Sequence, residues 1–82
     1  MNHEQIREKV IAFLGNYLPL DGLGDKDNIF QTRAVNSLFA MQLVLFVEKE
    51  FGIQVENEDL EMSNFESIHA VTGLVARKTS NQ

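Results

Sequence analysis

The chain has no cysteine, and only one proline and five glycines occur among its 82 residues. Without cysteine there is no disulfide and no protein thiol to act as a nucleophile, so any thioester chemistry would need a thiol supplied by another molecule. A hydrophobic share of 44%, with no low-complexity tract, is typical of a globular domain. This length predicts a single domain over residues 1–82 and leaves little room for a deep catalytic cleft.

Positive charge is also scarce. Seven lysine and arginine residues face twelve acidic ones, for a net charge of −5. This balance argues against nucleic acid and anionic membranes as partners and favours basic proteins. No apolar run approaches the roughly 18 residues of a membrane span, and the N-terminal residues show no signal-peptide pattern. We therefore expect a cytoplasmic protein.

The first segment has the spacing of a helix with one buried stripe. Its apolar residues are Ile6, Val10, Phe13, Leu14, Tyr17 and Leu18. Asn2 and Gln5 have the spacing of a capping box, with Asn in the place of the usual Ser or Thr. Pro19 is expected to end this helix, because the residue before a proline is disfavoured in the α region.

A long connection without periodicity follows, over residues 20–36. Three aspartates in it suggest a calcium loop: Asp21, Asp25 and Asp27. The spacing of such a loop would require an oxygen ligand at Ile29 and a glycine at Phe30, and the sequence has neither. We expect a solvated connection with no metal site.

The second helix is predicted from about Ser37 to Phe51, with Asn36 as its N-cap and Gly52 as the left-handed residue that closes it. Ile53 should pack back onto it. Because the first backbone N–H groups of a helix have no acceptor inside the helix, its start favours an anion beside Ser37.

The remainder predicts one short and one longer helix. A short turn over residues 56–62 should place Leu60 and Met62 inward. Residues 63–66 have the pattern of a capping box, with Ser67 as a rival N-cap, and the final amphipathic helix ends near Arg77 and Lys78.

These elements predict an all-α bundle of four helices, three main helices plus one short helix, with a long first connection. The second helix should be central, covered by the first and the last. The expected core consists of Ile6, Val10, Phe13, Leu14, Ile29, Phe30, Leu43, Val47, Phe51, Ile53, Val55, Leu60, Ile68, Val71, Leu74 and Val75.

Four segments, in order, resemble the acyl and peptidyl carrier proteins. They are Asn36-Ser37-Leu38, which resembles the phosphopantetheine attachment site, Asp27-Asn28-Ile29-Phe30 before it, Val47-Glu48-Lys49-Glu50-Phe51-Gly52-Ile53, and Asn64-Phe65-Glu66-Ser67-Ile68. The resemblance therefore covers nearly the whole chain. It implies a four-helix carrier fold with 4'-phosphopantetheine covalently attached to Ser37, whose thiol holds an acyl or aminoacyl thioester. Asn36 stands where such carriers commonly have Asp; it keeps the capping role and removes a charge.

The run from Asn36 to Val44, with Phe46-Val47-Glu48-Lys49, further resembles freestanding carriers of unusual polyketide extender units of the hydroxymalonyl, methoxymalonyl or aminomalonyl type. The implied partners are a phosphopantetheinyl transferase, a loading enzyme, tailoring enzymes such as dehydrogenases, and an acyltransferase or synthase acting in trans. We expect a freestanding monomer that serves secondary metabolism.

One face of the second helix is predicted to dock these partners. The candidate docking residues are Leu38, Phe39, Met41, Gln42, Leu45 and Glu48. The alternative is that the apolar ones pack beneath the long connection. Six of the twelve acidic residues lie between Glu48 and Glu61, where they would attract basic partners or simply form a solvated face.

Two other classes of function remain. A helical interaction module without cargo would share the carrier shape, and Ser37 would then be a plain helix cap. An enzyme is disfavoured, because His3 and His69 lie on other helices than Ser37 and Gly22-Leu23-Gly24 lacks the strand and third glycine of a nucleotide loop.

Overall fold

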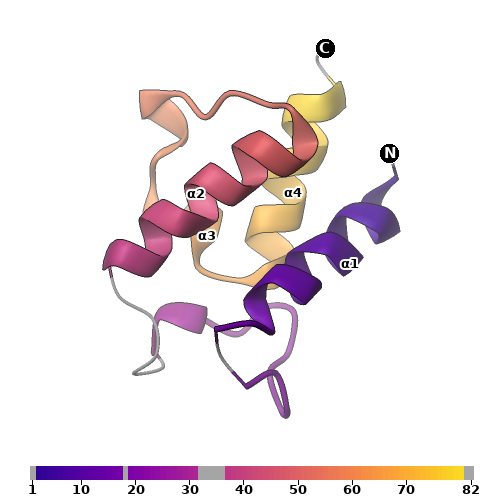
Figure 1. Ribbon diagram of the computed structural model, residues 1–82, viewed down its shortest axis with the longest axis vertical. Coiled ribbons are helices and arrows are strands. Elements are labelled where there is room, and N and C mark those ends of the chain that lie inside the picture. Colours follow the sequence, from indigo (N-terminus) through magenta and orange to yellow (C-terminus); the bar gives the residue numbers. More distant parts are fainter. Residues whose placement is uncertain (1, 18, 32–36, 81–82) are drawn as a thin grey trace.

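The computed structural model describes residues 2–17, 19–31 and 37–80. It confirms the all-α bundle with three longer helices and one short one (Figure 1). Two 3-10 turns interrupt the connections. The elements are α1 (His3–Leu14), η1 (Ile29–Gln31), α2 (Ser37–Phe51), η2 (Asn57–Asp59), α3 (Met62–Phe65) and α4 (Ile68–Ser80).

Helix α1 begins as predicted and ends earlier. Asn2 Oδ1 accepts the N–H of Gln5, and the Gln5 side chain accepts the N–H of Asn2, which completes the capping box. After Leu14, the N–H groups of Asn16 and Tyr17 bond to carbonyls three residues back rather than four. This tightening closes the helix before Pro19 exerts any effect.

Helix α4 is the hub of the bundle, which corrects the expectation that α2 is central. It packs most extensively against α1, and also against α3 and α2. Aromatic rings fill the space between α1 and α2: Phe13 stacks on Phe46 with ring centroids 4.2 Å apart, and Phe39 lies 6.1 Å from Phe13. These bulky rings separate the two backbones, so α2 lies at one side of the bundle (Figure 1).

The core agrees with the prediction at most positions. The residues Ile6, Val10, Leu14, Ile29, Leu43, Val47, Phe51, Ile53, Ile68, Val71, Leu74 and Val75 are all buried. Phe13, Phe30 and Val55 are only partly buried. Leu60 was wrongly placed in the core: it is 52% exposed, because the turn before it is a short 3-10 segment rather than an inward-facing helix. Phe65 takes an inward position that the sequence did not indicate.

The ends of α2 and α4 show how the later connections are fixed. Gly52 has φ of +64°, which is the left-handed closure predicted for α2. At the start of α4, Ser67 Oγ accepts the N–H of Ala70, so Ser67 caps this helix rather than the predicted Ser63. The expected inward orientation of the Met62 side chain lies outside what the structure describes.

Candidate modification and docking site on helix α2

The structure places Ser37 at the first position of α2. Asn36, the expected cap, lies outside the described residues, as does the side chain of Ser37. The helix that follows has 15 residues, and an α-helix carries about half a positive charge at its N-terminus. A serine at this position therefore lies where a phosphodiester is electrostatically favoured.

Beyond Ser37, an apolar stripe of α2 faces solvent. Leu38 is 67% exposed, and Met41 and Leu45 are each 60% exposed. Their spacing of three and four residues aligns them along the helix, and we call these three residues the α2 ridge. The alternative that they pack beneath the long connection does not hold for the described part of the chain. Gln42, also predicted to dock, is exposed beside them.

Phe39 does not belong to this face. Its side chain is 4% exposed and lies in the aromatic layer, with its ring centroid 5.3 Å from that of Tyr17. Because each helical residue advances about 100°, Phe39 falls on the same side as Leu43 and Val47, four and eight residues later. We therefore remove Phe39 from the predicted docking residues and assign it to the core.

Glu48 has a structural contact as well as its place on this helix. Its side chain is half-buried, and its Oε2 accepts the N–H of Val55 at 2.9 Å. The bond ties the segment that follows Gly52 to the last turns of α2. One carboxylate oxygen is thus engaged within the fold, which leaves the other for the docking role predicted for this residue.

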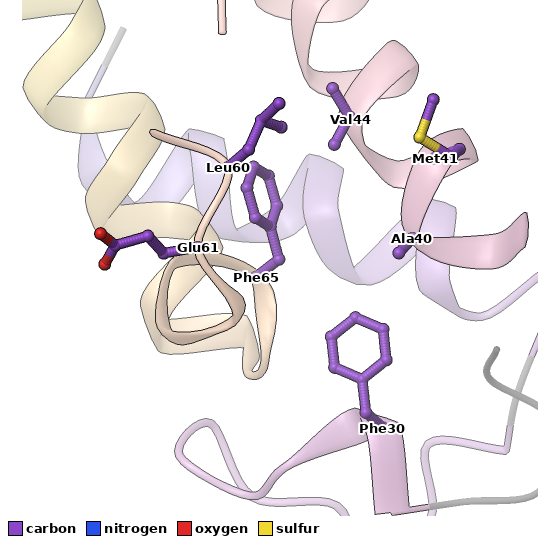
Figure 2. Close-up of a pocket in the computed structure, with 7 residues that line it drawn as sticks. All are labelled: Phe30, Ala40, Met41, Val44, Leu60, Glu61 and Phe65. Carbon is purple, nitrogen blue, oxygen red and sulfur yellow. The ribbon is translucent and has the colours of Figure 1, made fainter. Parts of the chain in front are cut away.

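A small apolar pocket opens between α2 and the segment that leads into α3 (Figure 2). Its volume is about 250 Å³. It is lined by Phe30, Ala40, Met41, Val44, Leu60, Glu61 and Phe65. Figure 2 shows Phe30 at one end, with the α2 side chains on one side and Leu60 and Phe65 on the other. Met41 belongs to both the ridge and the pocket. Sequence periodicity missed this pocket because its walls come from three separate segments.

Two acidic residues, Asp59 and Glu61, flank Leu60 of the pocket lining in the sequence, and the carboxylate of Glu61 points away from the pocket (Figure 2). Asp59 forms an ion pair with Lys78, with Oδ2 and Nζ 2.5 Å apart. The hydrogen bond from Lys78, helped by the N–H of Glu56, holds the pKa of Asp59 below its ordinary value, and the same pair raises the pKa of Lys78. Glu61, which lines the pocket, forms no ion pair within residues that the structure describes.

The long connection is fastened to the helices at Asp25 and Ile29. Arg7 donates from Nε and Nη2 to the two carboxylate oxygens of Asp25, at 2.6 and 2.8 Å, and this hydrogen-bonded contact lowers the pKa of Asp25. The carbonyl of Asp25 accepts the N–H of His69, and Ile29 donates its N–H to the carbonyl of Glu66. The connection is thus attached to α1 and to the α3–α4 junction.

The remaining candidate site residues form local hydrogen bonds or lie at the surface. Asp27 Oδ2 accepts the N–H of Gly24 in a turn, which uses one of the oxygens of the supposed calcium loop. His3 and His69 are exposed. Across the described ranges, no cluster of three or more potential metal-binding side chains is found, and no helix has the length and apolar character needed to cross a membrane.

The chain was also compared with known proteins. No model of a known protein family matches it, and no curated protein matches it.

Proposed function

We propose that this chain is an acyl or peptidyl carrier protein in which Ser37 carries 4'-phosphopantetheine. The observation that carries the proposal is the position of Ser37 as the first residue of α2, followed directly by an exposed apolar ridge. In this proposal the attachment point would begin the same helix whose exposed ridge receives the partner proteins. The order of helices agrees with the fold that the resemblance implies.

The chemistry of the chain is consistent with this role. The attached group would supply the thiol that a protein without cysteine lacks, and with it the thioester that holds the cargo. The start of α2 would stabilise the phosphodiester by roughly 0.3 to 1 kcal/mol if the group is solvent-exposed. Ser37 acts as the substrate of a transferase, and the chain itself performs no catalysis.

The partners follow from the same proposal. A phosphopantetheinyl transferase modifies Ser37, a loading enzyme adds an acyl or aminoacyl group, tailoring enzymes such as dehydrogenases alter it, and an acyltransferase or synthase receives it in trans. We place the chain in secondary metabolism in the cytoplasm, as a monomeric carrier of an unusual polyketide extender unit. Its acidic surface favours basic docking faces on these enzymes.

The test is coexpression with phosphopantetheinyl transferases of broad specificity, followed by intact mass spectrometry. The expected result is one added phosphopantetheine on the wild type and none on Ser37→Ala. Ser63→Ala is the matched control, since Ser63 is an exposed serine in the first turn of α3 and should leave the modification intact. An unmodified wild type with every transferase tried, or a modified Ser37→Ala, would refute the proposal.

A carrier-shaped interaction module without cargo is the second candidate, and the exposed α2 ridge favours it as well. The two candidates differ in their dependence on Ser37. A module would retain its partner after Ser37→Ala, and protein isolated from its native host would carry no added mass. A carrier would lose transfer of the cargo in the same variant, even if docking persisted.

A further inference from the structure

Residues 56–64 contribute little to the core. Between Val55, which is half-buried, and Phe65, which is buried, none of the side chains that the structure describes is buried. The hydrogen bonds that close the turns here, such as that from the N–H of Leu60 to the carbonyl of Asn57, join residues of the same segment. Segments with few buried apolar side chains open at a lower free energy than the core. This segment should therefore detach before the helical bundle unfolds.

Polar contacts from the last turn of α4 attach the segment to the bundle. Lys78 pairs with the carboxylate of Asp59, and Arg77 Nη2 donates to Asn64 Oδ1 at 3.4 Å. Asp59 also joins the two turns of the segment to each other. Its Oδ2 accepts the N–H of Glu56 at 3.0 Å, and its carbonyl accepts Nδ2 of Asn64 at 2.9 Å. The attachment of the whole segment thus depends on Asp59.

The ion pair between Lys78 and Asp59 is shielded from solvent better than a comparable pair elsewhere. Its side chains are 24% and 17% exposed, whereas those of Lys9 and Glu50 are 44% and 40% exposed. Solvent screens the first pair less, so it should contribute more to holding its two segments together.

The position of this segment determines the shape of the pocket. Leu60 follows Asp59 directly and lines the pocket across from Val44 and Met41 of α2 (Figure 2). Detachment of the segment at Asp59 would withdraw Leu60 from the pocket, whereas Phe65 would remain in the core. The pocket would then be open along one side.

We propose that residues 56–64 form a flap that opens and closes the pocket, and that the ion pair between Lys78 and Asp59 is the clasp that holds the flap closed. The flap turns about Val55, whose N–H is bound by Glu48 Oε2, and about the buried Phe65. Helices α1, α2 and α4 keep their packing while it opens. The flap requires neither a partner nor an attached group, so this proposal goes beyond the proposed function and can fail or hold independently of it.

The experiment is amide hydrogen exchange of the full chain, followed by NMR in increasing low concentrations of urea. The short turns of the flap are not stable once detached, so opening exposes the N–H groups of Leu60 and Asn64 to exchange. We expect these two amides to exchange faster than that of Val71 in α4, and with little dependence on urea, because a local opening exposes little surface. The amide of the buried Val71 should depend strongly on urea, since its exchange requires global unfolding.

Two lysine variants test the clasp. Lys78→Gln removes the ion pair with Asp59 and should speed the exchange of the flap amides about two- to fivefold, whereas Lys78→Arg keeps the charge and should preserve slow exchange. Lys9→Gln is the matched control, because it removes the ion pair with Glu50, which stays formed when the flap opens. Both glutamine variants lose a contact of the native state, so both can speed exchange through global unfolding. Only Lys78→Gln should speed the flap amides.

Asp59→Asn gives a second way to open the clasp. It keeps an oxygen that can accept the N–H of Glu56, and it should speed the flap amides as Lys78→Gln does. Circular dichroism checks the fold of each variant. Unchanged exchange of Leu60 and Asn64 in a folded Lys78→Gln or Asp59→Asn, or equal acceleration by Lys9→Gln, would overturn the clasp. A urea dependence of these amides as strong as that of Val71 would overturn the flap itself, because they would then be exposed only when the whole domain unfolds.

Discussion

The buried hydroxyl of Thr72 gives the sharpest test of the packing. Thr72 lies in the middle of α4, is 1% exposed, and its Oγ1 has no hydrogen-bond partner among the described residues. A buried polar group without a partner costs about 1 to 3 kcal/mol. Thr72→Val replaces the hydroxyl by a methyl group of nearly the same shape and keeps the branched side chain. We therefore expect the free energy of unfolding to rise by about 1 kcal/mol or more.

The assay is thermal and urea unfolding followed by circular dichroism. For a domain of this size, each 1 kcal/mol corresponds to about 4 to 8 °C in the melting temperature. Thr79→Val is a matched control in the same helix, because Thr79 Oγ1 donates to the carbonyls of Val75 and Ala76 at 2.9 and 3.2 Å. Thr79→Val removes these hydrogen bonds, so it should lower the free energy of unfolding by up to about 1 kcal/mol or leave it unchanged.

Thr72→Val should thus raise the free energy of unfolding, whereas Thr79→Val should lower it or leave it unchanged. If Thr72→Val is destabilising, or if both substitutions have the same effect, the hydroxyl of Thr72 has a partner such as a buried water and the reasoning is refuted. The slope of the urea dependence must stay constant, because a change in slope would indicate an altered unfolded state rather than a repaired core.

Three further predictions test the helix ends and faces. Because Lys78 lowers the pKa of Asp59 in the fold, the pairing stabilises the protein above the unfolded pKa of about 3.9, and this contribution is lost as the pH falls through the lower folded pKa. Asp59→Asn should therefore weaken the pH dependence of the urea midpoint on the acid side of about pH 4. In urea unfolding, Phe39→Ala should lower the free energy of unfolding by about 3 to 5 kcal/mol, whereas Leu38→Ala should lower it by less than about 0.5 kcal/mol. Equal losses of stability would contradict the assignment of Phe39 to the core. Gly52→Ala forces an alanine into a backbone conformation with φ of +64°, which should lower the free energy of unfolding by about 1 to 2 kcal/mol and lower the melting temperature. An unchanged melting temperature would contradict this.

The elements that could be predicted are those whose signals are local. The capping box at Asn2 and Gln5, the span of α2 and the closure at Gly52 each depend on residues within a few positions of one another. Helical periodicity also identified most of the core. Phe39 lies four residues before Leu43, so the same periodicity would have placed it in the core. It was wrongly included among the docking residues because these were chosen from neighbouring positions rather than from one face of the helix.

The features that could not be predicted depend on how distant segments meet. The central position of α4 follows from the aromatic layer that separates α1 from α2. The stacking of Phe13 on Phe46 in this layer produces no periodic pattern in the sequence. The exposure of Leu60 depends on a 3-10 turn that is tied to α4 through Asp59 and Lys78. The pocket requires Phe30, α2 and Phe65 to converge, so its existence is a tertiary property.

The exposed ridge of α2 contributes little to the stability of the fold. Leu38, Met41 and Leu45 add little to the folded state where they stand, since most of their surface remains in water in both the folded and the unfolded chain. Polar residues at these three positions would keep the helix and improve solubility. These three residues follow Ser37 along α2 and lie beside a pocket, whereas Leu43 and Val47 of the same helix are buried in the core. The carrier role proposed above would require such a helix, with one face packed in the core and the other left apolar for docking.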